Sequence, residues 1–469
     1  METGGRVLRS KPVAFDPYGV VLGKVLYPAW ERLRGRPTLP MLHQMLQTQW
    51  TPADEREATR DGSLRRLIRH AYQHTTHYRR VLDAAGVSPH DILTVADLHR
   101  IPLLDRGALQ SSPEDRTAPW PAVVYAKVTS GSTGQPAHIK YSEESRNWRD
   151  ATRWRGFGWG GYHMGDKAMH VWGVNAAAPS RLQEIRLAVD RKLRRDVYVN
   201  CLVRSPEVLA GMVDTFRREK PNVVIGFAQA MGDLARYINT NGLRDWPDTN
   251  VIYGAERLWP HDRAEVVKAF GPEVYETYGC REFTLMGAEC EMHDGLHESM
   301  ENLVVEIVVR EDDGRVRAAR PGEQGEVAVT DLHNLAYPFI RYLNGDLAIE
   351  REQAPCACGR TLRRFGPVAG RAVETLTDGR GSRVDGLMFN ILFLEVSRYA
   401  KQFQVVQHVD RAVTLRIVST TPGTLDPDGE RIIRGFVADR LYGVPLEIVV
   451  VDEIPLSKSG KLARVIVEK

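Results

Sequence analysis

The chain has 469 residues, about three times the length of an average domain, so it is expected to contain at least two separate cores. Hydrophobic residues make up 43% of it and charged residues 26%, and 63 basic against 60 acidic side chains leave a net charge of +3. This balance is typical of a globular protein and excludes both a disordered chain and a dedicated nucleic-acid binder.

The longest apolar stretches, at residues 387–396 and 446–451, are well short of the roughly 20 residues that a membrane helix needs. The N-terminal segment has scattered basic residues but no apolar core with a small-residue cleavage site, so a secretory signal is not expected there. We therefore expect a cytoplasmic protein with no membrane partner. Five cysteines are too few and too unevenly spaced for a disulfide framework.

The first 120 residues are predicted to be mainly helical. Leu64, Leu67, Ile68, Ala71 and Tyr72 are spaced for one apolar helix face, and Gly86 is placed to stop the helix after Leu82. This pattern indicates packing and not chemistry. We assign residues 1–120 to a helical first part of the large domain.

An α/β pattern begins after this helical part. An apolar strand from residue 122 leads into a glycine loop, and a helix over residues 181–195 then alternates with apolar strands at 222–225 and 250–253. This alternation predicts that residues 121–370 form the core of a large α/β domain with several sheets. Strands around the turns at residues 312–314 and 321–322 predict that one of these sheets is antiparallel.

The last hundred residues have a different pattern. Strands at 402–409, 412–418 and 446–452 and an amphipathic helix over 428–441 predict a small α+β domain. We expect this C-terminal domain to span residues 371–469, with the boundary at Gly370-Arg371.

The glycine loop at residues 129–136, TSGSTGQP, combines hydroxyl groups with glycines directly after a strand. Such a loop allows close backbone approach and offers many donors to phosphate oxygens. It lacks the Gly-Lys-Ser/Thr ending of the common P-loop and the Gly-x-Ser-x-Gly spacing of a hydrolase elbow. Taken alone, a Ser/Gly loop is more often only a turn.

Four further motifs follow this loop in the chain: YETYGCRE at 275–282, IRYLNGD at 340–346, Gly370-Arg371 and PLSKSGK at 455–461. With these motifs the sequence resembles the adenylate-forming superfamily of acyl-CoA synthetases. Within it, the sequence is similar to the branch of phenylacetate-CoA ligase, coenzyme F390 synthetase and CapK-like proteins. The resemblance covers nearly the whole chain and implies a C-terminal domain that moves during the reaction.

The resemblance also implies roles for individual residues. Two residues are implied to be catalytic, Glu282 as the Mg²⁺ ligand and Lys461 as the cation that assists adenylate formation. The residues implied to bind the ATP phosphates are Thr129, Ser130, Gly131, Ser132, Thr133 and Gly134. Those implied to bind adenine and ribose are Gly254, Ala255, Glu256, Tyr278, Gly279, Asp346 and Arg371. The acyl pocket is expected at Trp172, Gly173 and Phe227, although a Trp and a Phe are more often core residues.

Elementary chemistry agrees with these roles. A carboxylate such as Glu282 is a hard oxygen ligand suited to Mg²⁺, and an aspartate such as Asp346 accepts bonds from two hydroxyl groups. A flexible ammonium such as Lys461 stabilises negative charge in a transition state. Taken one at a time, each of these residues could equally be an ordinary surface charge.

The chain departs from the family pattern at several positions. Arg281 stands where a Thr usually precedes the Mg²⁺ glutamate, and Leu343-Asn344 replaces the usual Arg-Thr. At the expected hinge, Val373 stands where the family has its first Asp, and Glu374 is the second acid. Hinge residues absorb backbone rotation and need not be acidic, so these changes do not by themselves stop domain movement.

Three cysteines and one histidine form a candidate metal site: Cys290, His297, Cys356 and Cys358. Three thiolates and one imidazole fill a tetrahedron, which suits a structural Zn²⁺. The spacing also resembles a zinc site found in part of the phenylacetate-CoA ligase branch. The alternative is that these are free thiols, and His293 competes with His297 as the ligand. Cys201 and Cys280 are expected to be ordinary buried or site-lining thiols.

The resemblance implies a reaction in two steps. ATP activates a carboxylic acid, which could be aromatic, to an acyl-adenylate with release of pyrophosphate, and the acyl group then passes to a thiol, for which we favour coenzyme A. The implied cofactors are ATP, Mg²⁺, coenzyme A and a structural Zn²⁺. A homodimer is mildly favoured by analogy, and no nucleic acid is expected as a partner.

Other functions stay open from the sequence alone. The acceptor could be an amine, a hydroxyl or a carrier-protein thiol, or AMP could pass directly to a substrate as in F390 synthetase. From a different class, the chain could be a degenerate adenylation fold that acts as a scaffold. Retention of Glu282, Asp346 and Lys461 argues against the scaffold, whereas Leu343 and Val373 argue weakly for it.

Overall fold

The computed structural model describes residues 16–468 except for gaps at 112, 129–137, 174–180, 202–203, 256, 312, 372–374, 382, 386–387, 397 and 456–462. Its first part is helical, as predicted. Leu64, Leu67, Ile68 and Ala71 are fully buried along one helix face, and Gly86 has a φ of +64°, which favours glycine after a helix end. The helices of this part are α1 (Pro17–Val21), α2 (Tyr27–Leu33), α3 (Thr38–Thr48), α4 (Ala53–His74), α5 (Thr76–Ala84) and α6 (Arg106–Ser111).

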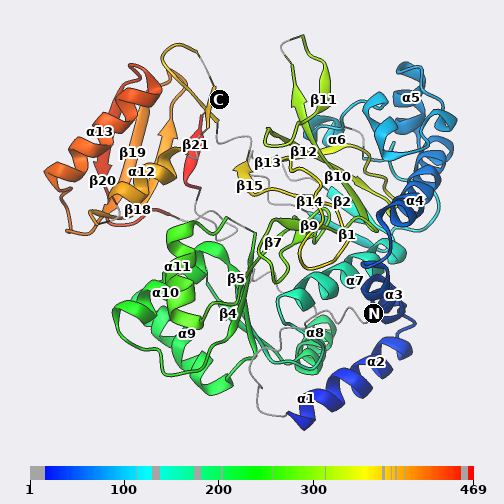
Figure 1. Ribbon diagram of the computed structural model, residues 1–469, viewed down its shortest axis with the longest axis horizontal. Coiled ribbons are helices and arrows are strands. Elements are labelled where there is room, and N and C mark those ends of the chain that lie inside the picture. Colours follow the sequence, from blue (N-terminus) through cyan, green and yellow to red (C-terminus); the bar gives the residue numbers. More distant parts are fainter. Residues whose placement is uncertain are drawn as a thin grey trace.

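A sheet that includes β4, β5 and β7 runs through the large body (Figure 1). It has eight strands in the order β14-β9-β8-β7-β6-β5-β3-β4. The strands from β4 to β7 are parallel, and β8, β9 and β14 continue the sheet antiparallel. The parallel strands are β3 (Ala168–Trp172), β4 (Asp196–Asn200), β5 (Val223–Phe227), β6 (Asn250–Gly254) and β7 (Val274–Tyr278), and the others are β8 (Gly287–Ala288), β9 (Leu296–Glu298) and β14 (Arg364–Phe365).

Helices connect the parallel strands, as the alternating pattern predicted. Every residue of β5 is buried, because helices cover both faces of a parallel sheet. The helices are α7 (Glu143–Trp159), α8 (Arg181–Arg194), α9 (Pro206–Glu219), α10 (Ala228–Thr240) and α11 (Pro260–Phe270). The expected strand before the glycine loop is β1 (Tyr125–Val128), and it pairs antiparallel with β2 (His138–Tyr141).

The predicted antiparallel sheet is present as a separate five-stranded sheet in the order β11-β10-β12-β13-β15. Its strands are β10 (Leu303–Arg310), β11 (Val316–Ala318), β12 (Gln324–Asp331), β13 (Tyr342–Ile349) and β15 (Val368–Arg371). The register between β12 and β13 shifts at residues 326–328, so β13 bulges beside its Asn-Gly-Asp segment. Asp346 lies in this bulge.

The C-terminal part has its own four-stranded sheet, in the order β20-β19-β18-β21. Its core is separate and includes Phe389, Val405, Leu415 and Ile433. The elements are β16 (Thr375–Thr377), β17 (Arg383–Asp385), α12 (Met388–Val396), β18 (Ala400–Gln407), β19 (Val413–Ser419), α13 (Pro427–Leu441), β20 (Leu446–Val450) and β21 (Val465–Val467). The predicted strands and the α13 helix of this part are confirmed.

The C-terminal part lies beside α11 of the large body (Figure 1). Arg464 Nη2 is 3.8 Å from Asp262 Oδ2, and the rings of His261 and Phe393 have their centroids 5.7 Å apart. Among the described residues, no helix is long and apolar enough to cross a membrane. The predicted fold class, a large α/β body with several sheets followed by a small α+β unit, is confirmed.

Candidate active site and metal centre

The carboxyl ends of the parallel strands bring several predicted site residues together. Trp172 ends β3, Phe227 ends β5, Gly254 ends β6 and Tyr278 ends β7. Phe227 is directly opposite Gly254 in the strand register, and the rings of Trp172 and Phe227 have their centroids 4.2 Å apart. Ligands of parallel α/β sheets bind at this edge, so the fold gathers these residues where a substrate site is expected.

Two glycines allow close packing at this edge. A Cβ on Gly254 would lie 2.6 Å from the Thr277 hydroxyl oxygen, and a Cβ on Gly279 would lie 1.8 Å from the Thr284 carbonyl oxygen. Neither contact tolerates a side chain, so glycine is required at both positions. Ala255 has a φ of +65°, which turns the chain sharply after β6.

Asp346 belongs to the antiparallel sheet, yet it meets Tyr278 of the parallel sheet. The Tyr278 hydroxyl donates a hydrogen bond of 2.8 Å to Asp346 Oδ2. Burial raises the pKa of Tyr278 and the charge of Asp346 raises it further, so the phenol keeps its proton and acts as the donor. The backbone of Arg371 in β15 pairs with Asp346 in the strand register, which adds a third predicted site residue to this point.

Glu282 follows β7 and is 8% exposed. Burial raises the pKa of Cys280, and the nearby carboxylates of Glu282 and Asp346 raise it further. Both carboxylates therefore lie within electrostatic range of one thiol.

A buried arginine supports the segment that carries Glu282. Arg149 of α7 donates to the Glu282 carbonyl oxygen, forms an ion pair with Asp331, and donates to the Ser145 hydroxyl at 3.0 Å. Its guanidinium also lies 4.9 Å from the ring centroid of Tyr141. The position of the Glu282 segment is therefore set by a buried charge network and not by the sheet alone.

Several predicted site residues lie outside the described residues. These are the phosphate-loop residues Thr129, Ser130, Gly131, Ser132, Thr133 and Gly134, together with Glu256, Val373, Glu374 and Lys461. Their predicted roles stay predictions.

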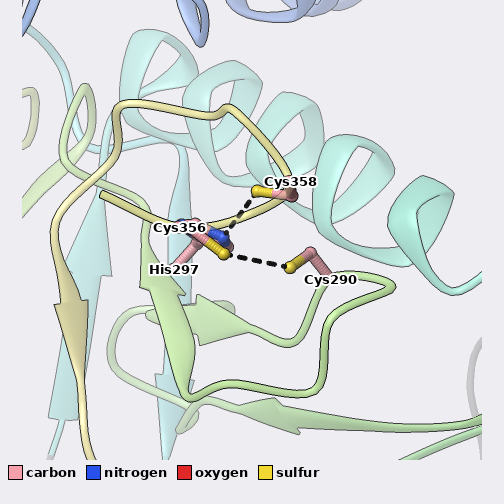
Figure 2. A group of neighbouring side chains, drawn as sticks. All are labelled: Cys290, His297, Cys356 and Cys358. Carbon is pink, nitrogen blue, oxygen red and sulfur yellow. Dashed lines mark hydrogen bonds between the residues drawn. The ribbon is translucent and has the colours of Figure 1, made fainter. Parts of the chain in front are cut away.

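The four predicted metal ligands lie together in the structure (Figure 2). Cys290, His297, Cys356 and Cys358 come from three separate segments, and their ligand atoms all lie within 4.8 Å of one another. His297 belongs to β9, whereas the Cys356-Cys358 pair is on the loop before β14. The close Cys-Ala-Cys pair thus meets a thiol and an imidazole more than sixty residues earlier in the chain.

Two of the distances between the candidate ligand atoms agree with tetrahedral zinc. Zn–S bonds of about 2.3 Å and a Zn–N bond of about 2.0 Å place two sulfurs about 3.8 Å apart, and sulfur and nitrogen about 3.5 Å apart. The sulfurs of Cys290 and Cys356 are 3.8 Å apart, and Cys358 Sγ is 3.4 Å from His297 Nε2. The other ring nitrogen of His297 is 3.4 Å from the Leu362 carbonyl oxygen, which favours the tautomer that leaves Nε2 as a ligand.

Nearby side chains surround this cluster. The Trp159 ring packs edge-on to His297 with a centroid distance of 5.5 Å, and the backbone N–H of Arg360 donates to Cys358 Sγ at 3.4 Å. His293, the competing ligand, lies instead 3.1 Å from Glu289. The donor set therefore fits a four-coordinate site in which no position is left for a reactive water.

The chain is similar in sequence to curated phenylacetate-coenzyme A ligases. It is 25% identical to the ligase of Thermus thermophilus over 448 residues, covering 88% of this chain and 97% of the relative. It is 27% identical to the ligase of Escherichia coli strain K12 over 349 residues, covering 69% and 72%. The sequence resemblance to phenylacetate-CoA ligases is confirmed. No family model matches the chain.

The fold agrees with this relationship. A crystal structure of 2-hydroxyisobutyryl-CoA ligase in its postadenylation state, in complex with R3-HIB-AMP, has a TM-score of 0.70 and 20% identity. The match covers 90% of this chain and 92% of that ligase. The chain therefore has the fold of an adenylate-forming CoA ligase.

Two residues of this candidate site were missed or undervalued from the sequence. Arg149 lies in a helix with no motif, and nothing in its spacing distinguishes it from the other arginines of α7. Asn344 was recognised only as a departure from the family pattern. In the structure its amide contacts both Tyr278 and Asp346.

Proposed function

We propose that this protein is an AMP-forming acid–thiol ligase similar to phenylacetate-CoA ligase. The carboxylate of the acid attacks the α-phosphorus of ATP, giving an acyl-adenylate and pyrophosphate. The thiol of coenzyme A then attacks the acyl carbon, giving a thioester and AMP. The observation that carries the proposal is the similarity to named phenylacetate-CoA ligases over 88% of the chain, covering 97% of one of them.

The residues at the strand ends would bind different parts of the substrates. Tyr278 would contact the adenine and Asp346 the ribose hydroxyls. Trp172 and Phe227, whose rings pack together and of which Phe227 belongs to a hydrophobic core, would form an aromatic wall for the acyl group. Gly254, at the end of β6, Ala255, in the turn after it, and Gly279, directly after β7, would line the adenine and ribose site. The glycine loop and Glu256, which lie outside the described residues, would complete the nucleotide site.

Three groups would stabilise the negative charge of the ATP phosphates. Glu282 would hold Mg²⁺, which neutralises phosphate charge when it is bound. The phosphate loop would donate backbone and hydroxyl hydrogen bonds to the β- and γ-phosphates. Lys461 would approach the reacting carboxylate and the α-phosphate while pyrophosphate leaves.

The C-terminal unit would change its orientation between the two steps. We place the domain boundary at the end of Gly370-Arg371, one residue later than expected, because β15 with Arg371 still belongs to the sheet of the large body whereas β16 begins the C-terminal elements. Lys461 would act only in the first orientation. Rotation about the segment at Val373 would then open a channel for the long pantetheine arm of coenzyme A.

We also propose that Cys290, His297, Cys356 and Cys358 hold a structural Zn²⁺. The support is the agreement of two ligand–ligand distances with tetrahedral coordination, together with the burial of Cys290 and His297. The ion would tie β9 to the loop before β14. Glu282 lies only eight residues before Cys290, so this tie would also stabilise the chain that carries the Mg²⁺ ligand.

ATP–pyrophosphate exchange across a panel of acids, with phenylacetate as the first probe, tests the first step. Product analysis with and without coenzyme A then tests the second. Exchange that depends on one acid, followed by a thioester only when coenzyme A is present, supports the proposal. If exchange occurs but coenzyme A never yields a thioester, coenzyme A is not the acceptor of the acyl group. A chain that binds ATP and catalyses no exchange with any acid would favour the scaffold.

A further inference from the structure

Asn344, Tyr278 and Asp346 form a closed ring of hydrogen bonds. The Asn344 amide nitrogen donates to the Tyr278 hydroxyl at 2.7 Å and to Asp346 Oδ2 at 3.0 Å. The Tyr278 hydroxyl in turn donates to the same Asp346 oxygen at 2.8 Å. Each side chain of the ring is therefore bonded to both of the others.

The amide orientation of Asn344 follows from its partners. The backbone N–H of Asp346 lies 3.0 Å from Asn344 Oδ1, and a backbone N–H can only donate. The carbonyl oxygen of the amide must therefore face Asp346 N, which turns the NH₂ group toward the carboxylate and the phenol. A carboxylate only accepts, so the opposite orientation would be unfavourable at two contacts.

The local backbone presents these side chains to one another. Asn344 and Asp346 lie in the β13 bulge, and Gly345 between them has a φ of +85°, a conformation that favours glycine. The bulge brings alternate residues of one strand close enough to share a hydrogen bond. The amide oxygen of Asn344 accepts the hydrogen bond from the Asp346 backbone N–H, and its NH₂ group donates to Tyr278 and to the Asp346 carboxylate.

We infer that Asn344 is a positioning residue for ribose recognition, its amide fixing the Asp346 carboxylate against Tyr278 at the nucleoside site. The inference rests on the proposed function, because it requires ATP to be the ligand of Asp346. A carboxylate that receives two hydroxyl groups must hold its plane in one orientation. The two donors on Asp346 Oδ2 hold that plane. One of them is the hydroxyl of Tyr278, the residue that is expected to contact the adenine.

Thr or Asp at position 344 could not make the same set of hydrogen bonds. A Thr hydroxyl has one proton to donate, so it cannot bond the phenol and the carboxylate as the NH₂ group does. An Asp would keep the acceptor for Asp346 N but would place a second negative charge beside Asp346. These two substitutions separate the role of the amide in the turn from its role as a donor.

The test compares dissociation constants for ATP, 2′-deoxy-ATP and 3′-deoxy-ATP, measured by calorimetry on the full chain. Asn344→Ala should weaken ATP binding about tenfold, as expected for lost hydrogen bonds to a charged partner. It should weaken binding of at least one deoxy analogue by less than about threefold, because that analogue already lacks a hydroxyl that Asp346 would bind. The KM for the acid should not change.

Leu343→Ala is the matched control, one residue away on the same strand, and should leave the preference for ATP over the deoxy analogues unchanged. If Asn344→Ala does not fold, Asn344→Asp provides the same comparison with the turn acceptor retained, and it should lose at least as much preference for ATP. Equal weakening of all three nucleotides, or none, would overturn the inference while leaving the proposed function intact. A wild-type chain that binds no ATP would overturn both.

Discussion

The buried ion pair between Arg149 and Asp331 makes a contribution to stability that can be tested quantitatively. The Arg149 side chain is 4% exposed and that of its partner Asp331 is 0% exposed. Replacing Arg149 with Met keeps an apolar stem of similar length but leaves the Asp331 carboxylate buried without its cation. Breaking a buried ion pair in this way costs about 3–5 kcal/mol of unfolding free energy. In a domain of this size, where about 1 kcal/mol shifts the Tm by roughly 2 °C, we expect a fall of about 6–10 °C.

Scanning calorimetry at one fixed scan rate measures this fall. The control is Arg310→Met, which removes an exposed cross-strand pair with Glu326 whose two side chains are 49% and 31% exposed. That loss should be below about 1 kcal/mol. The double variant Arg149→Met/Asp331→Asn should recover most of the stability, because no charge is then left buried.

Activity gives a second measurement on the same variants. Arg149 donates to the carbonyl of Glu282, so its loss should reduce ATP–pyrophosphate exchange even well below the Tm. The double variant should regain stability more than activity, since the donor to Glu282 is still missing. The reasoning is refuted if Arg149→Met is no less stable than Arg310→Met, or if Asp331→Asn gives no recovery.

Three further variants test the remaining site residues. Lys461→Ala should remove most acyl-adenylate formation while preformed adenylate still reacts with coenzyme A, and an equal loss of both half-reactions would contradict its role. Asp346→Ala should weaken ATP binding by about 1–3 kcal/mol, and an unchanged affinity in a calorimetric titration would refute its contact with ribose. Cys358→Ser should abolish a stoichiometry of about one zinc per chain in elemental analysis and lower the Tm more than the activity at low temperature. A wild-type protein that is folded, free of metal and reactive toward thiol reagents would instead mean that the four residues hold no zinc.

The sequence predicted those parts of the site that depend on local motifs. Tyr278 and Asp346 stand in short motifs of characteristic order, and the structure brings them into contact although they belong to different sheets. The four candidate metal ligands were predicted from residue type, from spacing and from the family resemblance, and the structure brings them together. The structure adds the ligand distances that the sequence could not supply.

Residues that act through tertiary contacts were not predictable in the same way. Arg149 is one of several arginines on an amphipathic helix, and only the fold shows that it reaches Asp331 and the Glu282 carbonyl. Asn344 was visible as an exception to a pattern, but an exception does not reveal its partners. Its function depends on a bulge whose register is set by the neighbouring strand β12.

The contact between α11 and the C-terminal unit is consistent with a unit that moves. A separable interface must leave its buried polar groups satisfied after separation, because an unpaired buried charge is costly. Asp262 is 1% exposed, and it pairs with Arg236 of the large body as well as with Arg464 of the C-terminal unit. The pair with Arg464 is the long one, at 3.8 Å, and rotation would break it while the pair with Arg236 remains. The large body therefore supplies Asp262 with a partner that does not depend on the orientation of the C-terminal unit.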